Sequence, residues 1–426
     1  MLPAFETHAR AGRPRLLSAW SITLVCLVIL FVRKTDAFTR PQFWAEDGPV
    51  YFMTARQQGL RSLLRPYDGV FYLVQRAIAW IGNAVPVQDV PAFYNYAALA
   101  MNLAVLAFIA RSRIPITHPG LLALAVVCTP HSAEVWVNLT NLHWILGLGM
   151  LVLALQDDPK TTGGAVLESL LLAVMCLTGP FVLLFFPLFG VRAALRKSTV
   201  SWSFLAIVIM GALVQLACQL SAFRQERVGG TFDWHNPAWR SFWGNSLSGL
   251  LFVGPWMAQA AEFSIPLVLF SGLLYAWLTG YAIAKRDRAC ATFLFGAFSI
   301  LAAVAYTYHG HPEFVAYPLN YRYFYIPFVC TAWALIAVAE KSRPFRLLAG
   351  ALLLMIVGSA ASHFRAEPLA DKHWAEKSRL LGGPEPCVIP INPEPWRIYY
   401  LPPEMRGDSG SAAPAAGRVD APSDSN

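Results

Sequence analysis

Long uncharged, apolar runs separated by short polar segments dominate the chain. A membrane core about 30 Å thick needs roughly 20 apolar residues for each crossing helix. Nine runs approach or reach this length; they cover residues 16–32, 90–110, 114–133, 135–156, 199–222, 263–284, 289–310, 323–339 and 347–362. The pattern predicts an all-α, polytopic bundle of transmembrane helices.

One further apolar stretch, residues 161–191, is too long for a single crossing and holds one charge, Glu168. Thr178-Gly179-Pro180 lies in its middle, and proline both removes a backbone donor and disfavours helix at the residue before it. We therefore expect two helices here and about 11 spans in total.

Two alternatives bear on the span count. The first run follows Arg10, Arg13 and Arg15 as a signal peptide would, but Arg33-Lys34 comes after it without a small-residue cleavage site, which favours a retained helix. Residues 241–261 are a possible extra span. Their glycines and Pro255 favour a loop or an interfacial helix instead.

Composition narrows the class of protein. Hydrophobic residues make up 56% of the 426 and charged residues only 14%, against about one quarter in soluble domains. This balance argues against an ordinary soluble enzyme or a disordered chain. The net charge of +8 comes from dispersed basic residues without a stripe, so no nucleic-acid partner is expected.

The distribution of lysine and arginine predicts the orientation. With the N-terminus inside, the inner loops hold 15 of these residues in 42 positions, and the outer segments hold 18 in 175. The positive-inside rule therefore predicts a cytoplasmic N-terminus and an outer C-terminus. We expect a multi-pass protein of the cell membrane, namely a bacterial inner membrane.

The domain organisation follows from this topology. Residues 1–362 are the transmembrane domain, 363–406 a small outer segment, and 407–426 a disordered tail rich in Ser, Ala, Pro and Asp. In the outer loop 33–89, two amphipathic stretches at 49–64 and 70–81 are expected to lie along the membrane surface.

Four places on the predicted outer side carry polar groups, which are costly near a membrane. Just after the first span, Glu46-Asp47 precedes Gly48-Pro49. A carboxylate here could be a general base or hold a divalent cation. Asp47 could equally be a helix N-cap before a proline.

The second place follows the third apolar run and holds His131, Glu134, Asn138 and Asn141. The last three recur at helical spacing and would share one helix face, which could line an aqueous cleft or make interhelical hydrogen bonds. The third place is the Thr178-Gly179-Pro180 turn, which alone is only a helix break.

The fourth place precedes a late span and includes His309, Arg322 and Tyr323. A guanidinium pairs bidentately with phosphate oxygens, so Arg322 could grip a phosphate. It could equally snorkel to the headgroups, and the tyrosines could be an interfacial belt.

Taken in order, these motifs resemble those of the C-type integral-membrane glycosyltransferases (GT-C), especially the aminoarabinose- and mannosyl-transferase-like branch. The motifs are Glu46-Asp47, Leu177-Thr178-Gly179-Pro180 and Arg322-Tyr323 with Pro327 behind them. The Lys that this family has before its Gly-Pro is absent here, and Asn138 or Asn141 stands where its second acid would fall. The resemblance covers about residues 16–340.

The resemblance implies transfer of a sugar from a polyprenyl-phosphate-linked donor to a cell-envelope glycan or lipid on the outer face. It implies Asp47 as the catalytic carboxylate with Glu46 beside it. From the residues themselves, Arg322 with Arg40, Lys34 or His309 is expected to bind the donor phosphate, and a divalent cation remains an open possibility. The main alternative is a transporter or flippase of lipid-linked oligosaccharide, and a second is an O-antigen-type polymerase.

Overall fold

The computed structural model describes residues 18–131, 134–222, 235–315 and 321–405. The predicted inner segment 1–15 and the tail 407–426 fall outside these residues. Helices dominate, and the β-structure described is one two-stranded antiparallel sheet near the C-terminus. The all-α class of the transmembrane region is therefore confirmed.

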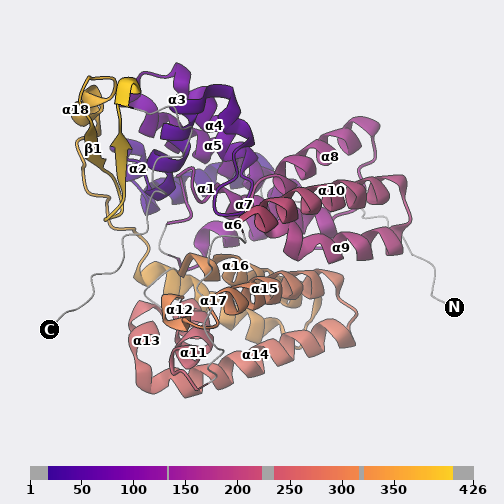
Figure 1. The fold of residues 1–426 in the computed structure, drawn as a ribbon. Helices are drawn as coiled ribbons and strands as arrows, with labels where there is room; N and C mark the ends of the chain where they lie inside the picture. Colours follow the sequence, from indigo (N-terminus) through magenta and orange to yellow (C-terminus); the bar gives the residue numbers. More distant parts are fainter. Residues whose placement is uncertain (1–17, 132–133, 223–234, 316–320, 406–426) are drawn as a thin grey trace.

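The apolar helices form two groups that lie against each other (Figure 1). The N-terminal group comprises α1 (Ala19–Arg33), α5 (Val90–Arg111), α6 (Pro119–Cys128), α7 (Leu142–Leu155), α8 (Thr162–Cys176), α9 (Phe181–Arg196) and α10 (Thr199–Ala222). The C-terminal group comprises α14 (Ser264–Ala284), α15 (Arg288–Thr307), α16 (Tyr325–Lys341) and α17 (Arg346–Ser362). Helices α15 and α16 join the groups by packing on α6, α7 and α9.

Five helical stretches are long and apolar enough to cross a membrane: Val87–Arg111, Thr199–Ala222, Ser264–Ala284, Arg288–Thr307 and Arg322–Lys341. Five shorter apolar helices accompany them, among them α1, α6 and α7. Many large apolar side chains face outward on these helices, including Leu273 at 73% and Leu354 at 73% exposure. The chain thus has the surface of a membrane protein.

The predicted division of residues 161–191 is confirmed, because α8 ends at Cys176 and α9 begins at Phe181. Gly179 lies between them with φ +103°, a conformation that side chains disfavour. A Cβ at this glycine would lie 2.9 Å from the Cβ of His143 in α7. The turn therefore needs glycine both for its backbone and for close contact with α7.

Short helical elements fill the long loop between α1 and α5, as its amphipathic stretches predict. They are α2 (Asp36–Thr39), η1 (Ala45–Asp47), η2 (Gly48–Phe52), α3 (Met53–Gln58), η3 (Gly59–Leu64), α4 (Leu73–Ile81), η4 (Gly82–Ala84) and η5 (Val87–Asp89). Helix α4 buries Val74, Ile78 and Ala79 and leaves Trp80 and Ile81 exposed.

Of the loop or interfacial helix expected at 241–261, the first part is helical. Residues 238–252 form a continuous helical stretch made of α11 (Ala238–Arg240), the π-helix η6 (Ser241–Gly249) and α12 (Leu250–Phe252), followed after a break by α13 (Pro255–Gln259) and η7 (Ala261–Phe263). Most residues of η6 are buried. At Gly244 the backbone approaches α14 so closely that a Cβ would meet the Ser264 carbonyl oxygen at 2.5 Å. The helix breaks at Gly254, where φ is +128°.

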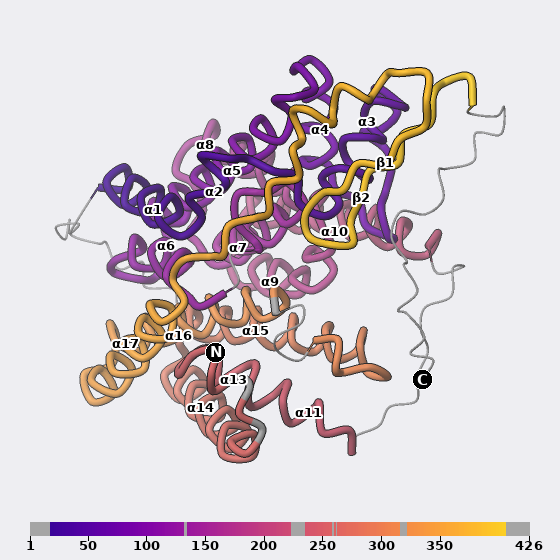
Figure 2. The backbone as a smooth tube through the Cα atoms, turned by 90° about the vertical axis from the view of Figure 1, so that its left-hand side faces the viewer, coloured from indigo at the N-terminus to yellow at the C-terminus, as the bar shows by residue number. Residues whose placement is uncertain are grey.

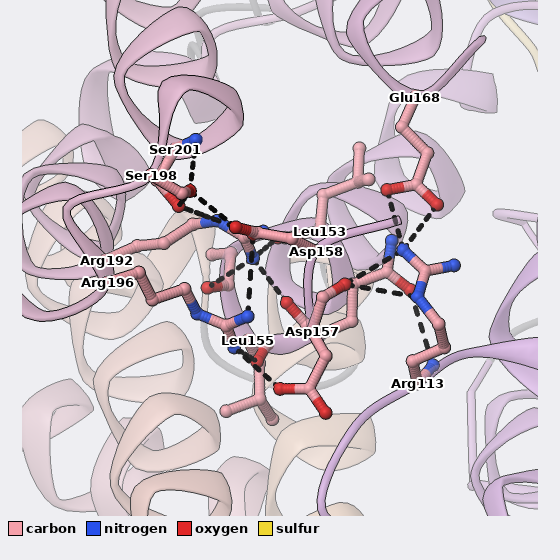
Figure 3. Close-up of polar contacts among 12 residues, drawn as sticks. Arg113, Leu153, Leu155, Asp157, Asp158, Glu168, Arg192, Arg196, Ser198 and Ser201 are labelled. Carbon is pink, nitrogen blue, oxygen red and sulfur yellow. Dashed lines mark hydrogen bonds and ion pairs between the residues drawn. The ribbon is translucent and has the colours of Figure 1, made fainter. Parts of the chain in front are cut away.

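A set of ion pairs, here called the ion-pair cluster, holds the C-terminal end of α7 (Figure 3). Arg192 of α9 donates to the carbonyl oxygens of Leu153 and Gln156, which lie at that end of α7, and forms an ion pair with Asp158. Its side chain is 1% exposed. The cluster comprises Arg113, Asp157, Asp158, Glu168, Arg192, Arg196, Ser198 and Ser201.

The C-terminal segment, residues 363–405, leaves α17, passes α2 and contacts η2 and η5 (Figures 1 and 2). It contains α18 (Trp374–Lys377), the 3₁₀ turns η10 (Ser378–Leu380) and η11 (Pro403–Met405), and strands β1 (Cys387–Pro390) and β2 (Arg397–Tyr400). The strands pair antiparallel with Cys387 opposite Tyr400. The segment packs on η2 and η5 of the loop between α1 and α5.

Candidate functional site

Three segments that are distant in sequence meet at one end of α7. They are η1 after α1, the loop between α6 and α7, and η9 (Tyr321–Phe324) before α16. Together they form the carboxylate cluster, which we define as Lys34, Glu46, Asp47, Glu134, Thr140 and Arg322. The cluster therefore unites two of the predicted motifs with the loop that lies between them in the chain.

Asp47 is the most enclosed member, with an exposure of 0%. Its Oδ1 accepts hydrogen bonds from the backbone N–H (2.8 Å) and hydroxyl (2.7 Å) of Thr140, and its Oδ2 accepts one from the Trp44 N–H at 3.3 Å. Burial raises the pKa of Asp47 to about 7, against the effect of these bonds. This carboxylate therefore ties the first loop to the 134–141 loop.

The capping alternative for Asp47 fails in its original form. Asp47 precedes Pro49 at the start of η2, but its side chain makes no cap bond to that helix. The carboxylate instead turns back to the Trp44 N–H. The acid is thus structurally engaged, although not as the N-cap that the sequence suggested.

Glu46, the neighbouring acid, is only partly buried. Burial raises the pKa of Glu46, and the nearby charges of Arg322 and Glu134 act on it in opposite directions. Of the two adjacent acids, Glu46 is therefore the less buried.

Arg322 and Glu134 form an ion pair through Nη1 and Oε1, with side chains 30% and 12% exposed. The Arg322 guanidinium also lies over the Tyr323 ring, 5.3 Å from its centroid. One N–H of the guanidinium is engaged by this bond, and arginine carries five. Arg322 thus points into the cluster rather than only toward the headgroups.

Lys34, the residue after α1, lies near the acids of the cluster. Its ammonium lies over the Trp44 ring, 5.4 Å from the centroid, and it feels the charges of Asp36, Glu134 and Asp47. Burial lowers the pKa of Lys34 despite these acids. Lys34, predicted as a phosphate contact, therefore lies within the cluster.

The predicted helical face at 134–141 is wrong, because this segment is a compact series of turns and α7 begins only at Leu142. Val137 has φ +54°, which no helix accommodates. The three polar residues still converge: Asn138 and Asn141 both donate through Nδ2 to the Glu134 carbonyl oxygen. They are 3% exposed each and support the loop, rather than facing an open surface.

Aromatic residues surround the cluster. His131 is 2% exposed and packs against Trp136 and Tyr325. Tyr323 lies against the Trp144 ring at 5.7 Å between centroids, and its hydroxyl bonds that of Tyr308 at 2.8 Å. His131 is therefore part of the supporting core, and Tyr323 lies between the cluster and α15.

Two predicted phosphate contacts lie elsewhere. Arg40 is exposed at the end of α2. The His309 ring contacts Tyr306, with Nδ1 2.7 Å from the Tyr306 carbonyl oxygen. The contacts described for these two residues do not include the carboxylate cluster.

Sequence reasoning missed two partners of the cluster. Thr140 binds Asp47 directly, and no local pattern marks such a hydroxyl. Tyr72 lies beside His143, with ring centroids 5.3 Å apart, and forms a β-bridge with Thr178. The Gly179 N–H donates to the Phe71 carbonyl oxygen at 2.9 Å. The Thr178-Gly179-Pro180 turn thus contacts residues 71–72, and Tyr72 in turn packs against His143.

In the described part of the chain, no three His, Cys, Asp or Glu side chains are grouped so as to hold a metal ion. The carboxylates of the cluster pair with Thr140 and Arg322 instead. The residues present therefore do not fit the divalent cation considered from the sequence.

No known protein family, no curated protein and no solved structure matches this chain. The geometry of the cluster is consequently the basis for assigning a function.

Proposed function

We propose that this chain is an integral-membrane glycosyltransferase that moves a sugar from a polyprenyl-phosphate-linked donor to a cell-envelope glycan or lipid on the non-cytoplasmic face. The observation that carries the proposal is the carboxylate cluster. It places two acids of raised pKa beside a partly exposed Arg322 at the end of the helix bundle. Perturbed acids beside a fixed cation are typical of functional sites.

Arg322 is the proposed donor-phosphate contact. Glu134 fixes the guanidinium through Nη1, and the remaining N–H groups of the fork can donate to phosphate oxygens. Lys34, whose ammonium lies over the Trp44 ring, is the second basic residue of the same cluster. Binding the leaving phosphate in this way would stabilise the negative charge that develops as the sugar departs.

Glu46 is the proposed general base. It is less enclosed than Asp47, so its carboxylate is the one proposed to take the proton of an acceptor hydroxyl as that oxygen attacks the sugar carbon. The bond from the sugar to the donor phosphate breaks in the same step, and the phosphate leaves with its electron pair. Asp47, with both oxygens engaged, holds the loop that carries Glu46.

The proposed arrangement has 11 spans, namely α1, α5–α10 and α14–α17, with the carboxylate cluster on the outer side and the ion-pair cluster on the inner side. The excess of lysine and arginine in the loops on the ion-pair side supports this orientation. Alkaline phosphatase and a fluorescent protein, fused separately after residue 405, test it. Only the phosphatase fusion should be active.

The activity is tested with purified protein in lipid vesicles that contain polyprenyl phosphate carrying a radiolabelled sugar. Transfer of label to a glycan or lipid acceptor on the same face supports the proposal. The flippase alternative predicts movement of intact labelled lipid to the opposite leaflet without cleavage. That result would replace the glycosyltransferase with a transporter.

A further inference from the structure

The C-terminal segment holds the loop that carries the two acids. The N–H of Ala45, next to Glu46, donates to the carbonyl oxygen of Asn392, and Trp44 forms a parallel bridge with the same residue. Contact between these two parts of the chain is therefore made at the backbone adjoining the acids.

The acid-bearing loop has a backbone that needs support. Ala45 has φ +46°, in the left-handed region that residues other than glycine rarely adopt. Such a conformation persists where the surrounding structure fixes it. The bond to Asn392 fixes the peptide group at this residue.

Three further contacts place the segment along the whole loop. The Ala366 N–H donates to the Arg33 carbonyl oxygen at 2.8 Å, and the Leu369 N–H donates to Asp36 Oδ2 at 3.0 Å. On the other side of the acids, the segment packs directly on Gly48, because a Cβ there would lie 2.8 Å from Ile391 Cδ1 and this side chain would have to shift.

Trp374 is the main side-chain anchor of the segment. It is 5% exposed, and its ring packs edge-on against Phe43 (4.6 Å between centroids) and Phe52 (5.5 Å). Its Nε1 donates to the Val87 carbonyl oxygen at 2.9 Å. Phe43 and Phe52 flank Glu46 and Asp47 in the sequence, so Trp374 contacts the loop on both sides of these acids.

We infer that the C-terminal segment positions Glu46 and Asp47 for reaction, with Trp374 as the positioning residue. The inference rests on the proposed function for its catalytic meaning, although the clamp itself can be measured independently. A clamped loop keeps Asp47 buried and Glu46 partly buried, and a released loop would expose both acids further to water.

The test compares the full-length wild type with Trp374→Ala and Trp374→Phe in lipid nanodiscs by hydrogen–deuterium exchange. Trp374→Ala should speed exchange of the amides of residues 44–48 at least tenfold and leave those of α7 and α16 unchanged. Trp374→Phe keeps a ring between Phe43 and Phe52 and should have a smaller effect. Gly48→Val, which wedges the segment from the loop, should act like the alanine variant.

Sugar transfer then tests the catalytic part. Trp374→Ala should lower the rate about tenfold or more without changing the donor KM, and shift the acid limb of the pH profile toward lower pH. Unchanged exchange at 44–48 in both Trp374→Ala and Gly48→Val overturns the clamp. Faster exchange throughout α7 and α16, or a wild-type rate and pH profile, overturns the positioning role. Absence of transfer by the wild type would count against the proposed function alone.

Discussion

The two polar clusters lie at opposite ends of α7, about 20 Å apart along its 14 residues. They differ in how their acidic side chains are paired with basic ones. In the ion-pair cluster, three arginines face three acids, and each acid has an arginine partner. In the carboxylate cluster, three acids face Lys34 and Arg322, and the ion pair described there joins Arg322 to Glu134.

The electrostatic consequences are opposite. Burial opposes ionisation of Asp158, yet the bond from Ser198 and the charges of Arg192 and Arg196 outweigh it and lower its pKa. Burial raises the pKa of both Glu46 and Asp47. Raised pKa values of this kind are typical of functional sites, and Asp47 also holds the first loop through its hydrogen bonds.

Removing the acids of the carboxylate cluster should have the largest effect on activity. This effect distinguishes the carboxylate cluster from the ion-pair cluster, whose loss should affect stability. Glu46→Gln keeps the size of the side chain and removes proton acceptance, so transfer should fall about 10²–10⁴-fold. Initial rates in reconstituted vesicles measure this. Asp47→Asn keeps an Oδ1 for Thr140 and should lose less activity if Asp47 only holds the loop.

A larger loss for Asp47→Asn than for Glu46→Gln would exchange the roles of the two acids. Full activity of the double variant, at normal expression, would remove the carboxylates from the mechanism.

Breaking the ion-pair cluster should instead cost stability. Arg192→Met leaves the carbonyl groups at the end of α7 without their donor and removes one partner of Asp158. We expect a loss of about 3 kcal/mol in the free energy of unfolding. Arg196→Met is the matched control, since its side chain is 20% exposed and should cost about 1 kcal/mol or less. Denaturant unfolding followed by tryptophan fluorescence measures both, and equal losses would contradict the comparison.

The phosphate contact gives an intermediate effect. Arg322→Lys keeps the charge and the pairing with Glu134 but loses the planar fork, so the affinity for polyprenyl phosphate should fall about tenfold. Arg40→Lys, at an exposed site outside the described contacts of the cluster, should bind as the wild type does. Equilibrium binding in detergent measures both, and unchanged affinity of Arg322→Lys would leave this arginine as a headgroup anchor.

The pH dependence should be the smallest and most diagnostic effect. The pKa of Asp47 is raised to about 7 in the folded state, so its neutral form favours folding. Its contribution to stability is complete below about pH 4 and is lost as the pH rises to about 7. Asp158, with a lowered pKa, contributes above its unfolded pKa and loses this contribution as the pH falls. Asp47→Asn and Asp158→Asn should therefore change the pH–stability slope in opposite directions.

Much of the helical framework follows from the sequence because a run of apolar residues bounded by charges leaves few choices. The predicted span at 199–222 coincides with α10, and the break at Gly179-Pro180 lies where the sequence places it. Residues 241–261 were expected to be a loop or an interfacial helix because of their glycines; their first part is helical, and Gly244 allows close packing on α14.

The site was predictable in its charged groups but not in its geometry. Glu46, Asp47 and Arg322 stand out because charges near apolar runs are rare. The 134–141 loop was expected to be helical because its polar spacing matches a helix, yet side-chain bonds to the Glu134 carbonyl oxygen organise a different backbone. The contact between Ala45 and Asn392 joins residues too distant in sequence for any local pattern to indicate.

The shortness of α6 has a consequence for the lipid that surrounds the protein. Ten residues of helix span about 15 Å, half the thickness of a typical hydrocarbon layer. In the proposed arrangement the irregular chain after α6 would lie at nonpolar depth, where Val135, Trp136 and Leu139 are enclosed by protein. A bilayer can also thin locally around such a short helix, at a cost of fractions of a kcal/mol per Å. Lipids with long acyl chains should thus strain this region more than lipids with short ones.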